Sequence, residues 1–372
     1  MNKRKLAAFY RENRGLHRWL LALAVILALF YLTRGNEGLM TFVAERVTGP
    51  LKYALGSLCA LVPFSVAELL CGAALGGGAL YLCASAADLI SPRGRRRGRI
   101  LYRRLLGAVC AVLSVYAGFC VLWGVNYYID GFQEKAGIEA RGGTAAELRQ
   151  VTALFADKVN ARAQTVARDE NGFFIVPRSE IYAAAPHIYD ALEQDYPFLE
   201  MRDLPPKPVA VSRAVSALQF TGFYFPFTGE TNLNNDSPAC LLPSTIAHEL
   251  AHQRGIASEQ ECNFLAVLAC ETGGNEVYAY SGALFAYIHL SNALYRADRE
   301  SWEALYHTLA PEAQLDLAYN SWYWQQFEGK TAEISKAGYD QFLKGYGDED
   351  GIRSYGKVVD LLLAYYGEQA EK

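Results

Sequence analysis

The sequence predicts a mainly α-helical chain with a small β element, an α+β fold in which transmembrane helices precede a second, helical domain. Apolar residues make up 52% of the chain, and their excess over the usual level lies before residue 130. The remainder contains helix-like patterns around one stretch, 220–234, that is rich in Thr, Gly and aromatic residues. We therefore expect a membrane region over residues 1–129 and a separate domain over residues 130–372.

Three segments of the first region are apolar enough to cross a bilayer. The first, at about 19–33, carries no charge and is flanked by Arg18 and Arg34. It is shorter than the ~20 residues that a helical span needs, so a cleaved signal peptide is the alternative, although no clear small-residue cleavage site follows. The other spans are expected at about 66–90 and 105–128. The lipid bilayer is therefore the first expected partner.

Lysine and arginine are distributed unevenly around these spans, and this predicts their orientation. The loop over 35–65 holds only Arg46 and Lys52. The positive-inside rule then places the N-terminus in the cytoplasm and the chain after about residue 130 outside the cytoplasmic membrane. With the arginines explained by topology and a net charge of −4, we expect no nucleic-acid partner. The basic residues on the proposed cytoplasmic segments are Lys3, Arg4, Lys5, Arg11, Arg14, Arg18, Arg93, Arg95, Arg96, Arg97, Arg99, Arg103 and Arg104.

Local signals place the helices and strands of the second domain. Thr144 and Glu147 form a capping box that opens a helix toward Gln164. A β-type run at 206–212 and a strand or hairpin at 220–234 precede a helix that ends near Gly255. Further helices are expected within 179–197 and at Ser258–Glu271, Val277–Tyr295, Thr331–Lys344 and Ser354–Tyr366.

The helix before Gly255 carries the sequence His248-Glu249-Leu250-Ala251-His252. Residues four apart lie one above the other on a helix, so both imidazoles can bind one Zn²⁺. Glu249 lies about 100° around the helix and can reach a metal-bound water as a general base. The pattern predicts a zinc site with two histidine ligands and a catalytic glutamate, and a chance match between ordinary histidines is the alternative.

A catalytic zinc site needs a third protein ligand, and two carboxylates follow the motif. Ser258 and Glu261 fit a capping box, in which Glu261 returns to the backbone N–H of Ser258. Glu259 would then remain for the metal, and Asn263, four residues on, could support a zinc-bound histidine. We expect Glu259 as the third ligand, with Glu261 as the alternative. Ordinary first-turn acids that stabilise a helix are the competing interpretation of both.

A hydrolase of this kind also needs a donor that stabilises the developing oxyanion. The sequence does not single one out, and His289 is also the next choice of ligand should neither glutamate bind. The side chains with suitable chemistry are Tyr278, Tyr280, His289, Arg353 and Tyr355.

The stretches FTGFYFPFTGETN, LLPSTIAHELAHQRG, EQECNFLAVLAC and SYGKVVDLLL resemble a family of bacterial membrane proteins called domain of unknown function 3810. The resemblance covers nearly the whole chain and implies a zincin-like metallopeptidase domain after the transmembrane helices. More distantly, Glu259-x-x-x-Asn263 resembles the gluzincin ExxxD pattern, which implies that Glu259 binds zinc. Asn263 stands where that pattern has Asp, and the spacing from His252 is shorter than in gluzincins.

Together these features predict a membrane-anchored zinc metallopeptidase that hydrolyses a peptide or protein substrate, with a zinc-bound water activated by Glu249. Two alternatives remain open. One is a non-catalytic membrane scaffold or receptor on the same fold, and the other is a zinc hydrolase that acts on a cell-wall amide. Glu249 favours catalysis, because a structural metal site has no need of this carboxylate.

The predicted orientation can be tested with a reporter that is active only in the cytoplasm, fused after Lys372. The reporter should be silent, because three spans that start from a cytoplasmic N-terminus leave the C-terminus outside. The same reporter fused within residues 91–96 should be active and serves as the control. Strong activity from the C-terminal fusion would contradict the three-span arrangement.

Overall fold

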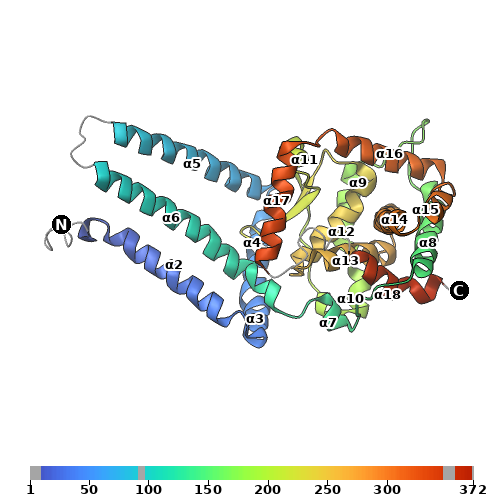
Figure 1. The fold of residues 1–372 in the computed structure, drawn as a ribbon, viewed down its shortest axis with the longest axis horizontal. Helices are drawn as coiled ribbons and strands as arrows, with labels where there is room; N and C mark the ends of the chain where they lie inside the picture. The colour runs from blue at the N-terminus through green and yellow to red at the C-terminus, as the bar shows by residue number, and fades with distance from the viewer. Residues whose placement is uncertain (1–9, 91–96, 347–356, 371–372) are drawn as a thin grey trace. The chain divides into compact units, whose positions relative to one another are not determined.

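The computed structural model describes residues 10–90, 97–346 and 357–370, and Figure 1 draws it as a ribbon. The chain divides into two compact units. The first comprises Met1–Lys52 and Val66–Ile129, and the second comprises Tyr53–Ser65 and Asp130–Lys372. The candidate spans lie in the first unit, and the motif with the two histidines lies in the second.

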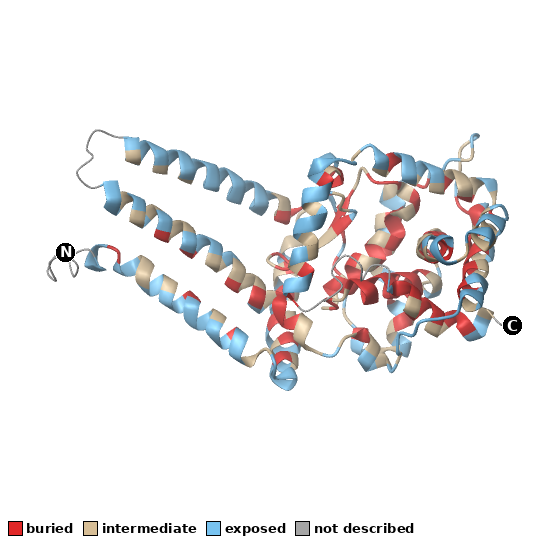
Figure 2. Cartoon of the chain, viewed as in Figure 1, coloured by how far each residue is buried: buried red, intermediate tan, exposed pale blue. Residues whose placement is uncertain are grey.

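Among the described residues, three helices of the first unit are long and apolar enough to cross a membrane: α2 (Arg14–Thr33), α5 (Val66–Ile90) and α6 (Arg97–Leu122). Most of their surface is exposed, as the pale blue along them in Figure 2 shows. The second span has the bounds that its composition predicts. The bounds of the first and third spans differ from the expected ones, because α2 and α6 both begin earlier, among charged residues. Helix α6 also ends earlier, before a 3₁₀ turn at Gly124–Tyr128.

The first unit has small apolar contacts where its helices meet. Leu23 of α2 packs with Leu106 and Cys110 of α6. Phe30, nearer the end of α2, packs with Met40 of α3 (Glu37–Val43) and with Cys120. A π-helical stretch at Ala44–Thr48 then leads from α3 into α4 (Gly49–Cys59).

Helices make up most of the second unit, and the capping box that opens α8 is confirmed. The Thr144 hydroxyl accepts the N–H of Glu147 at 3.2 Å, and the Glu147 carboxylate accepts the N–H of Thr144 at 2.7 Å. Expected helices at 258–271, 277–295 and 331–344 are present with bounds shifted by one or two residues. The helix expected at 354–366 is described from Val358 onward, and the start of the expected range lies outside the described residues. The helices are α7 (Phe132–Ala136), α8 (Ala145–Ala163), α9 (Arg178–Ala184), α10 (Asp190–Asp195), α11 (Ser212–Ala217), α12 (Leu242–Gln253), α13 (Glu259–Thr272), α14 (Glu276–Ala297), α15 (Arg299–Tyr306), α16 (Pro311–Gln325), α17 (Lys330–Gly345) and α18 (Val358–Ala370).

A three-stranded sheet is the β element of the second unit. Its strands are β1 (Lys207–Val209), β2 (Gly222–Phe225) and β3 (Glu230–Asn234), in the order β1-β3-β2. β2 and β3 form the antiparallel hairpin expected from the Gly-punctuated sequence, and β1 joins β3 in parallel. The sheet therefore has β3 at its centre and β2 at one edge.

Side chains on the central strand alternate between two buried faces, as the two-residue repeat of a strand requires. Thr231 faces α12, where its hydroxyl accepts a hydrogen bond from Gln253 Nε2 at 3.2 Å. Leu233 belongs to the main hydrophobic core, which α8, α12, α13, α14 and α18 build. Glu230 and Asn232 point to the other face, so the sheet has polar groups buried on the side away from α12.

Residues 53–65 cover that polar face and belong to the second unit, although they lie within the membrane region expected over residues 1–129. The buried ammonium of Lys207 donates to the carbonyl of Cys59 at 2.6 Å and to that of Phe64 at 3.0 Å. It also pairs with Glu230 at 2.7 Å. The Ser65 hydroxyl donates to Asn232 Oδ1 at 2.6 Å. These contacts hold residues 53–65 on the sheet, although their apolar sequence resembles that of the neighbouring candidate spans.

Substitution of Lys207 by Met should destabilise the second unit by about 3–5 kcal/mol, because it removes one charge of a buried ion pair with Glu230. Thermal and denaturant unfolding of the full chain in detergent, followed by tryptophan fluorescence, would measure this. Lys344→Met is the matched control. It removes an ion pair to Asp340 in which the lysine side chain is 43% exposed, so its effect should be about 0–1 kcal/mol. Equal, small effects of both variants would contradict the buried ion pair between Lys207 and Glu230.

Candidate metal centre

The helix that carries the motif is held at its C-terminal end by a tight turn. Gly255 has φ +90°, a left-handed value that favours glycine, and its N–H bonds the His252 carbonyl at 2.9 Å. The turn allows α13 to begin at Glu259, only a few residues after α12 ends at Gln253. The two helices then pack against each other, with the first turn of α13 beside the last turns of α12.

Arg254 anchors the same end of α12 to the surrounding chain. Its buried guanidinium pairs with Glu193 of α10 at 2.6 Å and with Asp203 at 2.7 Å. It also stacks over the Tyr189 ring, 3.9 Å from the ring centroid. Arginine suits this position, because its planar group can meet two carboxylates and an aromatic face together. The orientation of α12 is therefore set by a buried charge network next to the motif.

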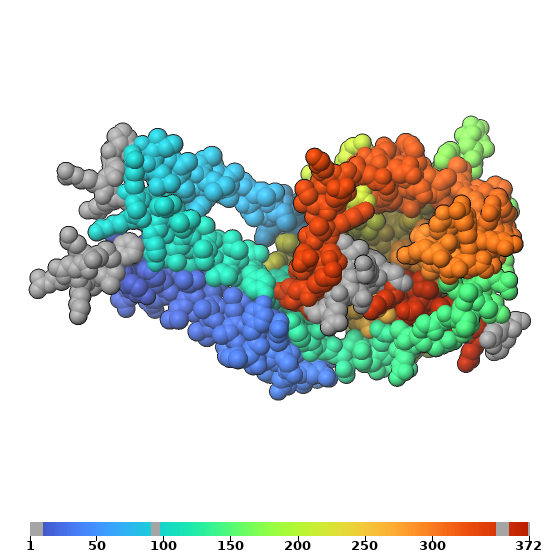
Figure 3. Space-filling view, in the orientation of Figure 1, coloured from blue at the N-terminus to red at the C-terminus, as the bar shows by residue number. Residues whose placement is uncertain are grey.

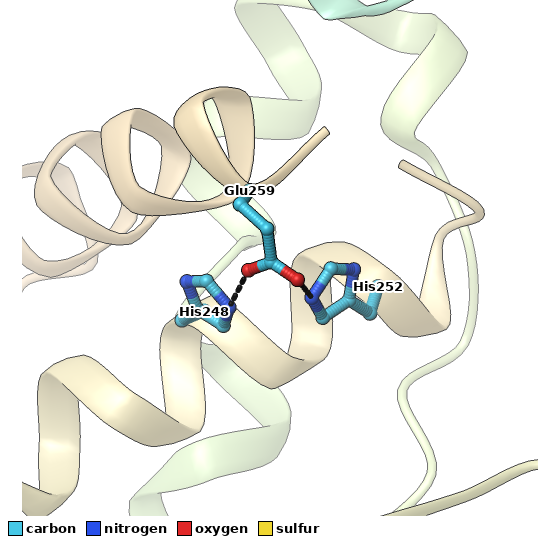
Figure 4. Close-up of side chains that lie close together, drawn as sticks. All are labelled: His248, His252 and Glu259. Atoms are coloured by element: carbon cyan, nitrogen blue, oxygen red, sulfur yellow. Dashed lines mark ion pairs between the residues drawn. The ribbon is translucent and has the colours of Figure 1, made fainter. Parts of the chain in front are cut away.

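The packing of α13 on α12 brings Glu259 between the two histidines of the motif, as Figure 4 shows. One carboxylate oxygen lies 3.2 Å from His248 Nε2, and the other lies 3.6 Å from His252 Nε2. The three ligand atoms all lie within 4.8 Å of one another, and the side chains are largely buried. Ligands about 2.0–2.1 Å from a tetrahedral zinc ion are roughly 3.3 Å apart, so these residues lie close to the spacing that zinc requires.

The charges of the three groups depend on one another. Burial raises the pKa of Glu259, but His252 and His248 together lower it well below its ordinary value. Burial lowers the pKa of His252, whereas Cys262 and Glu259 raise it well above the ordinary value. The carboxylate is thus ionised between the imidazoles. A divalent cation bound there would replace the proton of His252 as the partner of this negative charge.

The other ring nitrogen of His252 fixes which nitrogen faces Glu259. Nδ1 lies 2.8 Å from the carbonyl oxygen of Ile256, which can only accept a hydrogen bond, so Nδ1 carries a proton. The Cys262 sulfur lies 3.3 Å from the same nitrogen, and burial raises the pKa of this thiol to about 12. Nε2 of the neutral ring can therefore present its lone pair to a metal, the usual arrangement of a metal-bound histidine.

Glu249 points toward the edge strand of the sheet. The backbone N–H of Tyr224 in β2 donates to its carboxylate, and a Cβ placed on Gly222 would be 2.9 Å from its Oε1 atom. Burial raises the pKa of Glu249, and the charges of His248 and His252 offset this only in part. Its Oε2 atom is buried and has no hydrogen-bond partner among the described residues. A buried acceptor of this kind has the capacity to bind a water molecule.

Glu261 has a different position from the one that the sequence predicts. The Ser258 hydroxyl accepts the N–H of Glu261 at 3.4 Å, so half of the capping box is present. The Glu261 carboxylate, however, accepts the N–H of Gln133 at 2.9 Å and caps the start of α7. It is absent from the group of ligand atoms around the histidines, because the first turn of α13 directs it away from Glu259. The return contact to Ser258 was therefore predicted wrongly.

The supporting role expected for Asn263 stays a prediction. Its side chain is buried on α13, and its Nδ2 atom has no hydrogen-bond partner within the described ranges. The described contacts of His252 Nδ1 go to Ile256 and Cys262 instead.

The oxyanion candidates fall into three groups. Tyr278 and Tyr280 are buried in the core, where their hydroxyls donate to the Ile181 carbonyl and to Asp316. His289 lies near His248, and its pKa is lowered to about 4 by burial and by that neighbour. Arg353 and Tyr355 lie outside the described residues.

Sequence reasoning missed Tyr339 of α17, whose hydroxyl donates to Glu259 Oε1. No local pattern marks it, because the contact joins residues 80 positions apart.

The two glutamates can be separated by substitution with glutamine. Glu259→Gln should release Zn²⁺ at chelator concentrations at which Glu261→Gln still retains it. The first change removes the charge of a proposed ligand, whereas Glu261 is not part of the His248, His252 and Glu259 group. Glu261→Gln should instead cost about 1–3 kcal/mol of stability through the weakened bond to α7. Zinc content during chelator titration and thermal unfolding of the full chain are the measurements. The reverse order of zinc loss would reassign the third ligand to Glu261.

The sequence matches the model of a family described as Protein of unknown function (DUF3810) over residues 47–363. Searches of curated proteins and of solved structures find no match. The matched range includes α5, α6, the sheet and the His248, His252 and Glu259 group. Because the match covers most of its length, the chain belongs to this family of proteins of unknown function, DUF3810.

Proposed function

We propose that this protein is a zinc metallopeptidase with a zincin-like domain, anchored in the cytoplasmic membrane with that domain outside the cytoplasm. The observation that carries the proposal is that Glu259 lies between His248 and His252. On the helix of the two histidines, Glu249 has a buried oxygen with no hydrogen-bond partner among the described residues. The apolar helices α2, α5 and α6 support the membrane anchor. The side proposed for the domain rests on the lysine and arginine distribution alone.

The donor set supports zinc as the metal. Two imidazole nitrogens and one carboxylate oxygen form a set that is typical of catalytic zinc in peptidases, and such sites keep one position for water or substrate. When bound, zinc would polarise the scissile carbonyl and lower the pKa of a coordinated water. The protonated Nδ1 of His252 supports the same interpretation, since it leaves Nε2 for the metal.

Glu249 would move the proton in this reaction. Its Oε2 atom would accept a proton from the attacking water and then donate it to the nitrogen of the leaving amine. The water supplies the oxygen of the new carboxylate, and the peptide C–N bond breaks. The hydrogen bond from the Tyr224 N–H holds the carboxylate in place, so Oε2 remains for this exchange.

The edge strand β2 supports an extended peptide as the substrate. β2 pairs with β3 along one side, and within the described residues no strand pairs with its other side. A peptide that added to this edge as a further strand would run beside Glu249, because Gly222 of β2 lies against the Glu249 carboxylate. Peptide backbone groups would provide the affinity, and side-chain pockets would provide selectivity.

Substitution of Glu249 by Gln tests the proposal. The variant should keep one zinc ion per chain and lose activity by about 10²–10⁴-fold, because it removes the base and not a ligand. Full-length protein in detergent would be assayed with a library of quenched fluorescent peptides, with zinc measured on the same samples. Glu303→Gln, an exposed position on α15, is the matched control and should behave as the wild type.

Two results would contradict the proposed peptidase. One is cleavage by Glu249→Gln at the wild-type rate. The other is a wild-type protein that holds zinc and cleaves no peptide in the library.

A further inference from the structure

Tyr339 lies on α17, far along the chain from the His248, His252 and Glu259 group, and it contacts that group. Its hydroxyl donates to Oε1 of Glu259, the oxygen that also faces His252. The contact therefore joins α17 to the first turn of α13 at the residue proposed as the third ligand. A neutral hydroxyl is suited to this place, because it binds one carboxylate oxygen without competing for the charge of the metal.

The ring of Tyr339 is oriented by two aromatic neighbours. Phe220, which precedes β2, meets it edge-on with the ring centroids 5.5 Å apart. Phe342, one turn further along α17, stacks on it at 6.0 Å. Such pairs favour a defined mutual geometry over free rotation. The hydroxyl is thus aimed at Glu259 by packing between α17 and the start of the edge strand.

Helix α17 lies on the surface of the second unit, as Figure 3 shows. Its fully buried side chains are Ala332 and Leu343, while most of its other residues are exposed or half-buried. A further bond from the Ser335 hydroxyl to the Leu218 carbonyl at 2.8 Å holds its N-terminal half. Helix α17 therefore has far fewer buried side chains to hold it than α12 and α13 have.

A carboxylate ligand can rotate about its side-chain bonds and bind a metal through either oxygen. A hydrogen bond to one oxygen restricts that rotation, so the other oxygen is held at the metal. Partners of this kind typically change metal affinity by about 10–100-fold.

We propose that Tyr339 is a positioning residue of the metal centre, whose hydroxyl orients the Glu259 carboxylate, so that docking of α17 completes the third ligand. This inference rests on the proposed function, because it takes His248, His252 and Glu259 as metal ligands. It makes α17 a part of the site and not merely a cover over it.

The test uses the full chain in detergent with the substitution Tyr339→Phe, which keeps the ring and its packing and removes only the hydroxyl. Zn²⁺ affinity would be measured by competition with a chromogenic chelator, and should fall by about 10–100-fold. Co²⁺ in place of zinc provides a second readout, because its visible absorption bands report the geometry of the ligands. These bands should change in Tyr339→Phe while thermal unfolding of the metal-free protein stays as in the wild type.

Tyr319→Phe on α16 is the matched control. Tyr319 is 38% exposed and stacks on Trp322, so its loss of a hydroxyl should leave zinc affinity and the Co²⁺ bands unchanged. Glu259→Gln is the reference for a lost ligand and should weaken zinc more than Tyr339→Phe does. Unchanged zinc affinity and unchanged Co²⁺ bands in Tyr339→Phe would overturn this inference and leave the proposed metal centre standing. A wild-type protein that binds no zinc would overturn the metal centre, and this inference with it.

Discussion

The contact between the Glu259 carboxylate and the imidazoles of His248 and His252 is the constraint on which the rest of the site depends. Two of the three ionisable groups, His252 and Glu259, are buried and His248 is half-buried beside them, and burial of this kind is costly unless the charges meet or bind a metal. The left-handed turn at Gly255 makes the contact possible, because it returns the chain to α12 within a few residues. Glu249, which lies on the same helix as the two histidines, is directed toward β2.

Buried polar contacts also occur where the second unit continues into the candidate spans. Before α5, Lys207 and Glu230 hold residues 53–65 against the central strand. After α6, Glu261 binds the start of α7 from the same turn of α13 that carries Glu259. Each of these contacts satisfies a charge that would otherwise be buried alone. Elements next to the His248, His252 and Glu259 group are therefore bonded to the chain segments that precede α5 and follow α6.

How far the sequence predicts this structure depends on how local each signal is. The spacing of His248 and His252, the first-turn position of Glu259 and the Gly-punctuated hairpin are short-range patterns, and the structure has them where they were expected. The bond from Tyr339 and the pair of Lys207 with Glu230 depend on how separate elements pack, so no pattern of spacing marks them. Glu261 shows the limit most clearly. The predicted bond from its N–H to the Ser258 hydroxyl is present. Its carboxylate, however, accepts a hydrogen bond from the start of α7, which lies far away in the sequence.

The central claim is that two imidazoles and one carboxylate hold a zinc ion. X-ray absorption at the zinc edge of the purified full-length protein tests it most directly, because the spectrum reports the atoms bound to the metal. We predict a shell of nitrogen and oxygen atoms only, at about 2.0–2.2 Å, with the scattering pattern of two imidazoles. A sulfur ligand at about 2.3 Å, or protein purified without zinc that fails to take it up, would contradict the account.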